Sequence, residues 1–156
     1  MIAEDPTGKA GLRMDAAALN AFLARAFPGT PADRMVQVTS VGAGVAVLAM
    51  PTDSRNLRPG GVLSGPTMMG LADSAAYAVI LAHIGEVPMA VTTSLNIHFL
   101  RPCKPGTLIA EARLLKLGRR IATVDVLMYT EGPDRPAAKA TVAYAIPDGA
   151  PKEVAE

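Results

Sequence analysis

The sequence predicts an α+β fold in which an antiparallel sheet wraps around one long apolar helix. From Thr67 to His83 there is no proline and one glycine, and apolar residues cover most of the helical circumference, as in a buried helix. Segments with strand-like alternation are grouped together, mainly after this stretch, which favours an antiparallel sheet. An amphipathic segment near the N-terminus adds a second helix.

Length and composition set the broad class of the protein. We expect one domain spanning 1–156, with a core over about residues 34–146 and flexible tails at 1–12 and 148–156. A net charge of +1 and 4% aromatic residues argue against nucleic-acid and membrane partners. One cysteine and two histidines predict no metal site and no cofactor. Because no secretory signal is evident and an acid interrupts the apolar stretch, we expect a cytoplasmic protein.

The N-terminal part of the chain predicts one helix and one hairpin. Across residues 15–27, apolar side chains recur at spacings of three and four, and a Pro-Gly pair follows, which is typical of a packing helix. Residues 34–41 and 45–50 read as strands on either side of a Gly-Ala-Gly turn. Residues 51–58 then form a polar connection to the long helix.

The long helix is expected over about residues 66–83. Ser64 can cap it, and the Gly65–Pro66 pair suits a helix start, because proline fits the first helical position. Gly85 supplies a C-cap. Asp73 is the one acidic residue in this apolar stretch, where a carboxylate costs stability unless it is paired or hydrogen-bonded. Asp73 is therefore the leading candidate for a functional residue.

Long strands are expected after the helix. Strict alternation over residues 89–100 predicts two faces, one with Val91, Thr93, Leu95, Ile97 and Phe99 and the other with Thr92, Ser94, Asn96 and His98. Strands at 108–117 and 121–130 flank Gly118-Arg119, which fits a two-residue hairpin with glycine first. The last strand covers residues 138–146.

Three runs resemble the phenylacetate-type (PaaI-like) acyl-CoA thioesterases of the hotdog fold. SGPTMMGLADSA, residues 64–75, is similar to the family's His-Gly-Gly, short spacer and Leu-x-Asp on the central helix. AVTTSLNIHFLRP, residues 90–102, is similar to its next strand, which ends in Asn-x-x-Phe-Leu-Arg-Pro. AEARLLKLGRR, residues 110–120, is similar to the following hairpin. The resemblance covers about residues 34–146 and implies a hotdog fold, with the sheet around the central helix.

The resemblance also implies catalytic roles. Asp73 falls on the catalytic carboxylate, which acts as a general base or as a nucleophile. Gly65 aligns with the glycine whose N–H donates to the oxyanion, and Thr92 with the hydroxyl residue that helps position the attacking water. Ser64 and Pro66 stand where the family has histidine and glycine. Ser64 cannot titrate near neutral pH, and Pro66 lacks an N–H donor.

The implied substrate contacts lie on several segments. Arg58 occupies a position where many relatives carry asparagine, and Pro66 lies at the helix start. Arg119 and Arg120 form the basic turn that lies near the CoA phosphates in relatives, while a solvated hairpin tip is an equal alternative. Met69, with its neighbour Met68, is expected in the core or in the lining of an acyl pocket.

The implied function is hydrolysis of an acyl- or aryl-acyl-CoA to the free acid and CoA, in a homodimer or homotetramer, because relatives build the site between subunits. Two alternatives are a non-catalytic acyl-CoA or acyl-group binder and, less favoured, a hotdog dehydratase or hydratase. Asp73 could instead be a structural acid that pairs with Arg58 or caps a strand. We expect His83 to carry charge that favours the helix dipole and His98 to lie at a subunit contact.

Overall fold

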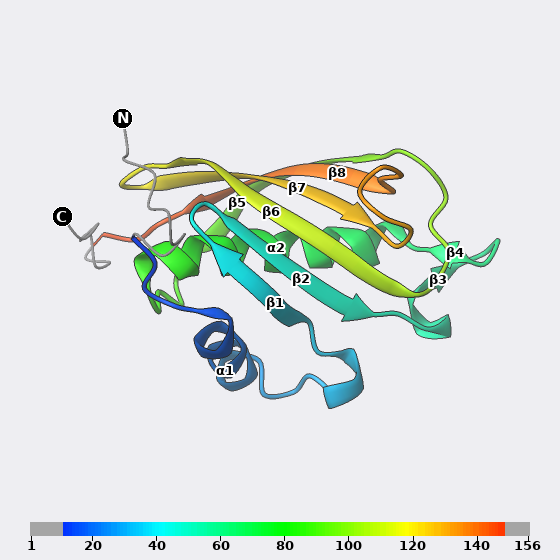
Figure 1. Ribbon diagram of the computed structural model, residues 1–156, viewed down its shortest axis with the longest axis horizontal. Helices are drawn as coiled ribbons and strands as arrows, with labels where there is room; N and C mark the ends of the chain where they lie inside the picture. The colour runs from blue at the N-terminus through cyan, green and yellow to red at the C-terminus, as the bar shows by residue number, and fades with distance from the viewer. Residues whose placement is uncertain (1–10, 149–156) are drawn as a thin grey trace.

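The computed structural model describes residues 11–148 and has the predicted α+β architecture, in which a six-stranded antiparallel sheet wraps around a long helix (Figure 1). The predicted tails lie almost wholly outside these residues. The helices are α1 (Ala16–Ala26), α2 (Gly65–Ile84) and the short 3₁₀ helices η1 (Ala32–Arg34) and η2 (Ser54–Asn56). The strands are β1 (Gln37–Gly42), β2 (Val45–Pro51), β3 (Leu57–Arg58), β4 (Val62–Leu63), β5 (Val91–Phe99), β6 (Thr107–Leu117), β7 (Ile121–Tyr129) and β8 (Ala138–Ala145).

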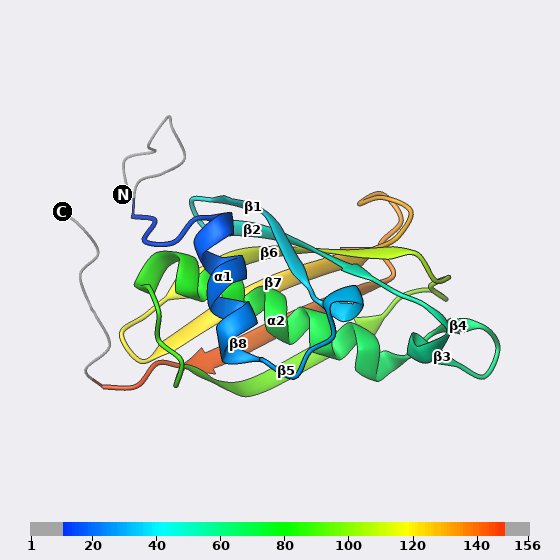
Figure 2. The same ribbon diagram turned by 90° about the horizontal axis from the view of Figure 1, so that it is seen from below.

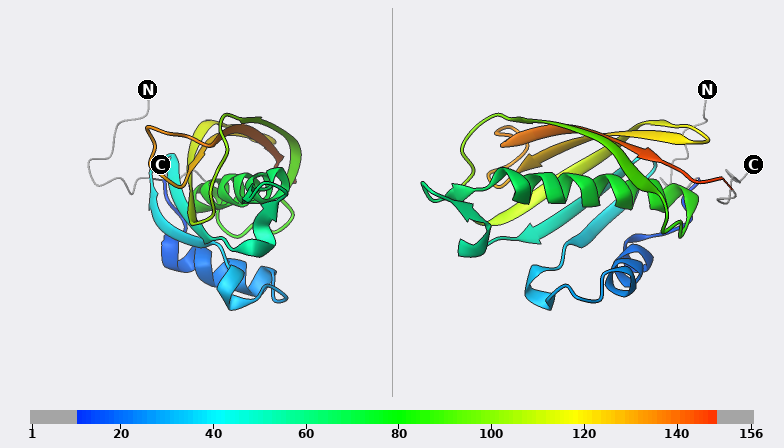
Figure 3. Two further views of the ribbon diagram at one scale, coloured as in Figure 1. Left: turned by 90° about the vertical axis from the view of Figure 1, so that its right-hand side faces the viewer. Right: turned by 180° about the vertical axis from the view of Figure 1, so that it is seen from behind.

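The large sheet has the strand order β1-β2-β6-β7-β8-β5, and every neighbouring pair is antiparallel. Viewed along α2, the sheet curves around the helix (Figure 3). The two edges of the sheet are therefore β1 and β5, which come from distant parts of the chain. Within residues 11–148, β5 pairs with β8 alone and its outer edge has no strand partner.

Helix α2 forms the centre of the core, as its apolar sequence predicts. Ser64 is the N-cap residue and accepts a hydrogen bond from the Thr67 N–H at 3.3 Å, and Gly85 ends the helix with a positive φ of 85°. It is the one described helix long and apolar enough to cross a membrane, but it is mostly buried beneath the sheet. The side of α2 that this chain leaves open carries exposed Pro66 and Met69 and half-buried Asp73.

Helix α1 lies below the sheet and crosses near α2 (Figure 2). The Asp15 carboxylate caps it by accepting from the Ala18 N–H at 2.8 Å, and its buried residues are Leu19, Phe22 and Leu23. Phe27, the last apolar residue of the helix predicted over residues 15–27, is the C-cap residue and is 55% exposed. The Asn20 side chain accepts from the Val38 N–H at 2.8 Å and donates to the Val38 carbonyl at 2.9 Å, which fixes α1 to the edge of β1.

The strict alternation predicted for β5 is wrong at its start. Thr92 lies opposite Tyr144 of β8, but the next paired residue is Ser94, opposite Ala143, so Thr93 is the extra residue of a β-bulge. The bulge places Thr92 on the inner face with Leu95, rather than on the outer face with Ser94 and His98. This change of face brings the Thr92 hydroxyl to α2.

Local features also differ from prediction in the connections. The polar connection before α2 contains η2 and the small β3–β4 ribbon. The sequence does not indicate this ribbon, because each of its strands has only two residues. The β6–β7 turn is centred on Arg119 and Arg120, one residue later than predicted, because the Gly118 N–H donates to the Ile121 carbonyl at 2.9 Å. A Cβ at Gly118 would lie 2.8 Å from that oxygen, so the close approach requires glycine.

Candidate active site

Asp73 lies in the ninth position of α2, on the side left open by the sheet, and one of its oxygens is held by two hydroxyls. Thr92 Oγ1 of β5 and Tyr144 Oη of β8 each lie 2.6 Å from Asp73 Oδ1. Asp73 Oδ2 has no hydrogen-bond partner among residues 11–148. The carboxylate is thus fixed through one oxygen and leaves the other available to a ligand or to water.

Tyr144 is a site residue that the sequence reasoning missed. Burial raises the pKa of its phenol far above the usual range, and the hydrogen bond to Asp73 raises that pKa further. The phenol therefore stays protonated and acts as a donor to the carboxylate. Its ring stacks on Tyr77 with centroids 5.7 Å apart. Period-two alternation in β8 puts Tyr144 on the inner face with Val142, a signal that could have indicated it.

The alternative of an Asp73–Arg58 ion pair is wrong. Arg58 is exposed on β3, and its Nε donates to the neighbouring Pro59 carbonyl at 3.3 Å. The partners of Asp73 are neutral hydroxyls instead of a cation. No described cation therefore contacts this carboxyl group directly.

A cavity of about 560 Å³ opens beside Asp73. The polar atoms of its wall near the acid come from Asp73, Ser74, Thr92 and Tyr144, and its remaining wall is mainly apolar. The lining residues are Leu23, Phe27, Thr30, Arg34, Met35, Val36, Asp73, Ser74, Tyr77, Pro88, Ala90, Val91, Thr92 and Tyr144. A mainly apolar cavity with a few convergent polar groups is typical of a small-molecule site.

The start of α2 is a separate location from this cavity. The Gly65 N–H has no acceptor among residues 11–148, and Pro66 brings no N–H. Ser64 Oγ lies 2.9 Å from Thr67 Oγ1 and also caps the helix, as its capping role predicts. The Phe99 ring packs over Gly65, where an added Cβ would lie 3.2 Å from Cζ. One free backbone donor therefore remains at this end of the helix.

The predicted CoA-contact residues fall in different places. Met69 is 41% exposed on the open side of α2 and does not line the cavity, whereas Met68 is in the core. Arg119 and Arg120 line a surface depression of about 600 Å³ together with Lys116. Arg120 also pairs with Asp148 at 3.3 Å, and both side chains are exposed.

Neither histidine lies in the cavity lining. His83 Nδ1 lies 2.8 Å from the Val79 carbonyl, and the Gly44 N–H donates to His83 Nε2 at 3.0 Å. Both ring nitrogens of His83 are thus engaged by backbone groups, one of α2 and one of the turn between β1 and β2. Among residues 11–148, no group of three or more His, Cys, Asp or Glu residues is arranged to hold a metal ion.

The fold and the site together define a class of protein, in which a sheet wraps around one helix and an acid lies at the wall of a cavity. The comparisons with known proteins identify this class as the thioester hydrolases. The family model of the Thioesterase superfamily matches residues 60–137. The chain therefore belongs to the Thioesterase superfamily. Asp73 and Thr92 lie inside the matched segment, whereas Tyr144 and the cavity-lining residues between positions 23 and 36 lie outside it.

Individual relatives support the same family. The chain is similar to a solved candidate thioesterase of Silicibacter sp. TM1040, with a TM-score of 0.78 and 39% identity, covering 87% of this chain and 94% of that one. It is similar to the phenylacetic acid degradation protein PaaI of Thermus thermophilus, with a TM-score of 0.63 and 28% identity over 72% and 93% of the two chains. Proofreading thioesterase EntH of Klebsiella pneumoniae is 31% identical over 93 residues, 60% of this chain and 68% of EntH.

Proposed function

We propose that the protein hydrolyses an acyl- or aryl-acyl-CoA thioester, with Asp73 as the catalytic carboxylate. One observation carries this proposal. Asp73 Oδ1 is held by Thr92 and Tyr144 at 2.6 Å each, while Oδ2 is unpartnered among the described residues at the wall of a mainly apolar cavity. A structural acid would be expected to have both oxygens satisfied, whereas a reacting carboxylate needs one oxygen free.

The free oxygen supports two forms of the reaction. As a general base, Oδ2 takes a proton from water while the water oxygen attacks the thioester carbon, and the proton passes to the sulfur as the C–S bond breaks. As a nucleophile, Oδ2 attacks the same carbon and expels the CoA thiolate, and water then hydrolyses the resulting anhydride. Both give the carboxylic acid and CoA without a metal or redox cofactor. Thr92 has a second possible role, because its hydroxyl can also position the attacking water.

The developing oxyanion needs a donor, and Gly65 is the candidate. Its N–H lies at the positive end of the α2 dipole, and a well-placed donor is worth about 3 kcal/mol in the transition state. Gly65 and Asp73 are eight residues apart in one straight helix, about 12 Å along its axis. One thioester cannot contact both within a single chain, so we infer that Asp73 of one subunit works with Gly65 of another.

A second copy of this chain is therefore part of the proposal, as a homodimer or a homotetramer. The open edge of β5 supports it, because exposed apolar residues accompany this edge and the open side of α2. These residues are Met69, Met89, Val91, Phe99 and Leu100. Apolar surface of this kind is typical of a subunit interface.

The proposal also assigns sites for the CoA phosphates and for further substrate contacts, together with a cellular location. The basic depression at Lys116, Arg119 and Arg120 suits the CoA phosphates, which arginine binds well. Pro66 and Arg58 are exposed near the start of α2, where they can contact the substrate of a neighbouring subunit's site. We propose a cytoplasmic protein whose partners are the acyl-CoA substrate and its own copies, with no role for nucleic acid or membrane.

The test is release of free CoA thiol from a panel of acyl-CoAs by the wild type, Asp73→Asn and Asp125→Asn. Asp125 is the matched control, because it too accepts from a β8 hydroxyl, that of Thr141, but pairs with Lys139 away from the cavity. We expect Asp73→Asn to lower kcat by about 10³-fold or more, and Asp125→Asn to leave turnover near the wild-type value.

Two other outcomes would replace the proposal. Binding of acyl-CoA without turnover on any substrate would favour the non-catalytic binder, for which the lost histidine at Ser64 and the lost N–H at Pro66 are the supporting features. Loss of the enoyl absorbance from an enoyl-CoA would favour a hydratase. That outcome conflicts with the absence of both His83 and His98 from the cavity lining.

A further inference from the structure

The cavity beside Asp73 is built from three parts of the chain, which are residues 23–36, residues 73–92 and Tyr144. Residues 73–92, inside the segment matched by the family model, supply the acid and its surroundings. The opposite wall comes from residues 23–36, which precede the matched segment and include the end of α1 and all of η1. At about 560 Å³, the cavity has the size of a small-molecule site.

The 23–36 wall is mainly apolar. Leu23, Phe27 and Val36 supply hydrocarbon and aromatic surface, and Phe27 is 55% exposed although it is a large apolar side chain. A ligand that covers Phe27 would remove this surface from water, which is favourable. Arg34 is the one cation and Asp73 the one acid among the described lining residues, so the lining has no net formal charge.

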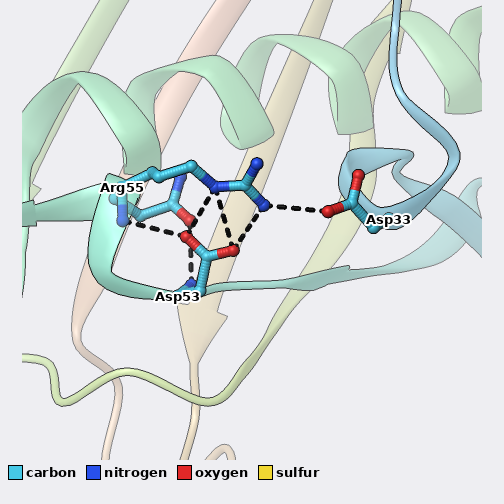
Figure 4. Close-up of polar contacts among 4 residues, drawn as sticks. Asp33, Asp53 and Arg55 are labelled. Carbon is cyan, nitrogen blue, oxygen red and sulfur yellow. Dashed lines mark hydrogen bonds and ion pairs between the residues drawn. The ribbon is translucent and has the colours of Figure 1, made fainter.

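This wall is fixed before any ligand arrives. Asn20 ties α1 to β1 through two hydrogen bonds to Val38, and Arg25 pairs with Glu86 at 2.7 Å. Arg55 contacts Asp53 and reaches Asp33 of η1 at 2.9 Å, which links η1 to the segment before α2 (Figure 4). A preformed wall loses little conformational freedom on binding, so it can discriminate between ligands by shape.

We propose that residues 23–36 form the acyl-binding wall and select an uncharged, apolar acyl group, either aliphatic or aromatic. This inference rests on the proposed function and names the substrate class of that site. With the thioester carbonyl at Asp73, the acyl group extends between Tyr77 of α2 and Phe27 of the wall. The choice of substrate is then made by a segment outside the part of the chain that carries the catalytic acid.

The experiment measures kcat/KM for acyl-CoAs from acetyl to dodecanoyl, with benzoyl-, phenylacetyl- and succinyl-CoA, for the wild type and three variants. Phe27→Trp narrows the cavity and Phe27→Ala widens it. Leu115→Ala is the matched control, because Leu115 is 58% exposed and lies outside the cavity. All four proteins should fold, since neither Phe27 nor Leu115 is in the core.

For the wild type we expect kcat/KM to rise about fourfold for each added methylene until the cavity is full. Phe27→Trp should move the preferred chain to a shorter length and lower kcat/KM for the longest substrates at least tenfold. Phe27→Ala should move the preference to longer chains, and Leu115→Ala should keep the wild-type profile. Benzoyl- or phenylacetyl-CoA should be hydrolysed at least tenfold faster than succinyl-CoA.

Failure of the inference is separable from failure of the proposed function. Hydrolysis with the same chain-length profile in the wild type and both Phe27 variants, or a preference for succinyl-CoA, would overturn the acyl-wall assignment and leave the thioesterase intact. If no protein hydrolyses any substrate, the dissociation constants of the same acyl-CoAs decide. A chain-length profile of binding that shifts in the Phe27 variants and not in Leu115→Ala would support the wall, and an unchanged profile would overturn it.

Discussion

The two polar positions on the open side of α2 differ in how completely this chain surrounds them. Asp73 is held by Thr92 and Tyr144 from two strands of the same chain and faces a cavity of the same chain. The Gly65 N–H has no acceptor within residues 11–148. The acid is thus held within residues 11–148, whereas the N–H at the helix start is left open to an acceptor from outside these residues.

Mixing two inactive variants tests this difference with the largest expected effect. Gly65→Pro removes the N–H at a helical position that tolerates proline, and should lower kcat by about 10²–10³-fold. Asp73→Asn is expected to be inactive for a different reason, because it lacks the catalytic carboxylate. If each site combines Asp73 of one subunit with Gly65 of another, mixed dimers contain one intact site, and refolding the two variants together should recover about one quarter of wild-type activity.

The control for this experiment is Gly65→Ala, which keeps the N–H. Its added Cβ would lie 3.2 Å from Phe99 Cζ, so the exposed ring has to shift slightly. We expect Gly65→Ala to retain most of the activity. Mixtures with no more activity than the separate variants would contradict the shared site and favour one complete site in each chain.

The next effect concerns the two donors to Asp73 Oδ1. Thr92→Val and Tyr144→Phe each remove one hydroxyl 2.6 Å from that oxygen, and each should lower kcat about tenfold, because a hydrogen bond to a charged group is worth about 1.5 kcal/mol or more. Thr92→Ser should keep activity near the wild-type value. Steady-state kinetics with matched unfolding curves would check this. Equal losses in Thr92→Ser and Thr92→Val would show that packing of the methyl group, rather than the hydroxyl, matters.

A third effect falls on stability alone. His83→Phe removes the bonds to Val79 and Gly44 at the far end of α2 and leaves the Gly44 N–H without its acceptor. We expect the free energy of unfolding to fall by about 1–3 kcal/mol with kcat unchanged below the transition. Denaturant unfolding of His83→Phe beside His98→Phe, a change on an exposed strand position, provides the measurement. A large loss of kcat would link this helix end to the site.

The smallest expected effect is a pH dependence of stability that arises from the Asp53 carboxyl group. Hydrogen bonds from the side chain and then the backbone of Arg55 lower the pKa of Asp53 to about 2. Because the folded-state pKa lies below the unfolded value of about 3.9, the stabilisation is present above about pH 4 and is lost as the pH falls toward about 2. In Arg55→Met, an NMR titration of Asp53 should move toward about 3.9. An unchanged titration would mean that Arg55 does not hold this acid.

The sequence predicted the main elements because their signals are local. The all-round apolar character of α2, its Ser64 cap and the period-two strands each depend on neighbouring residues, and they agree with the structure except at the start of β5. The inward direction of Thr92 depends on a bulge against β8, and the contact of Tyr144 with Asp73 joins residues 71 positions apart. Such features follow from strand register, which a single run of residues does not specify.

The two Asn20–Val38 hydrogen bonds have a consequence for how this sheet can grow. The Asn20 amide occupies both outward backbone groups of Val38, as the backbone of an added strand would. The edge at β1 is thereby capped against edge-to-edge aggregation, which exposed strands otherwise invite. Among residues 11–148, no strand pairs with the outer edge of β5. The two edges of the sheet therefore differ in how open they are to pairing with a further strand.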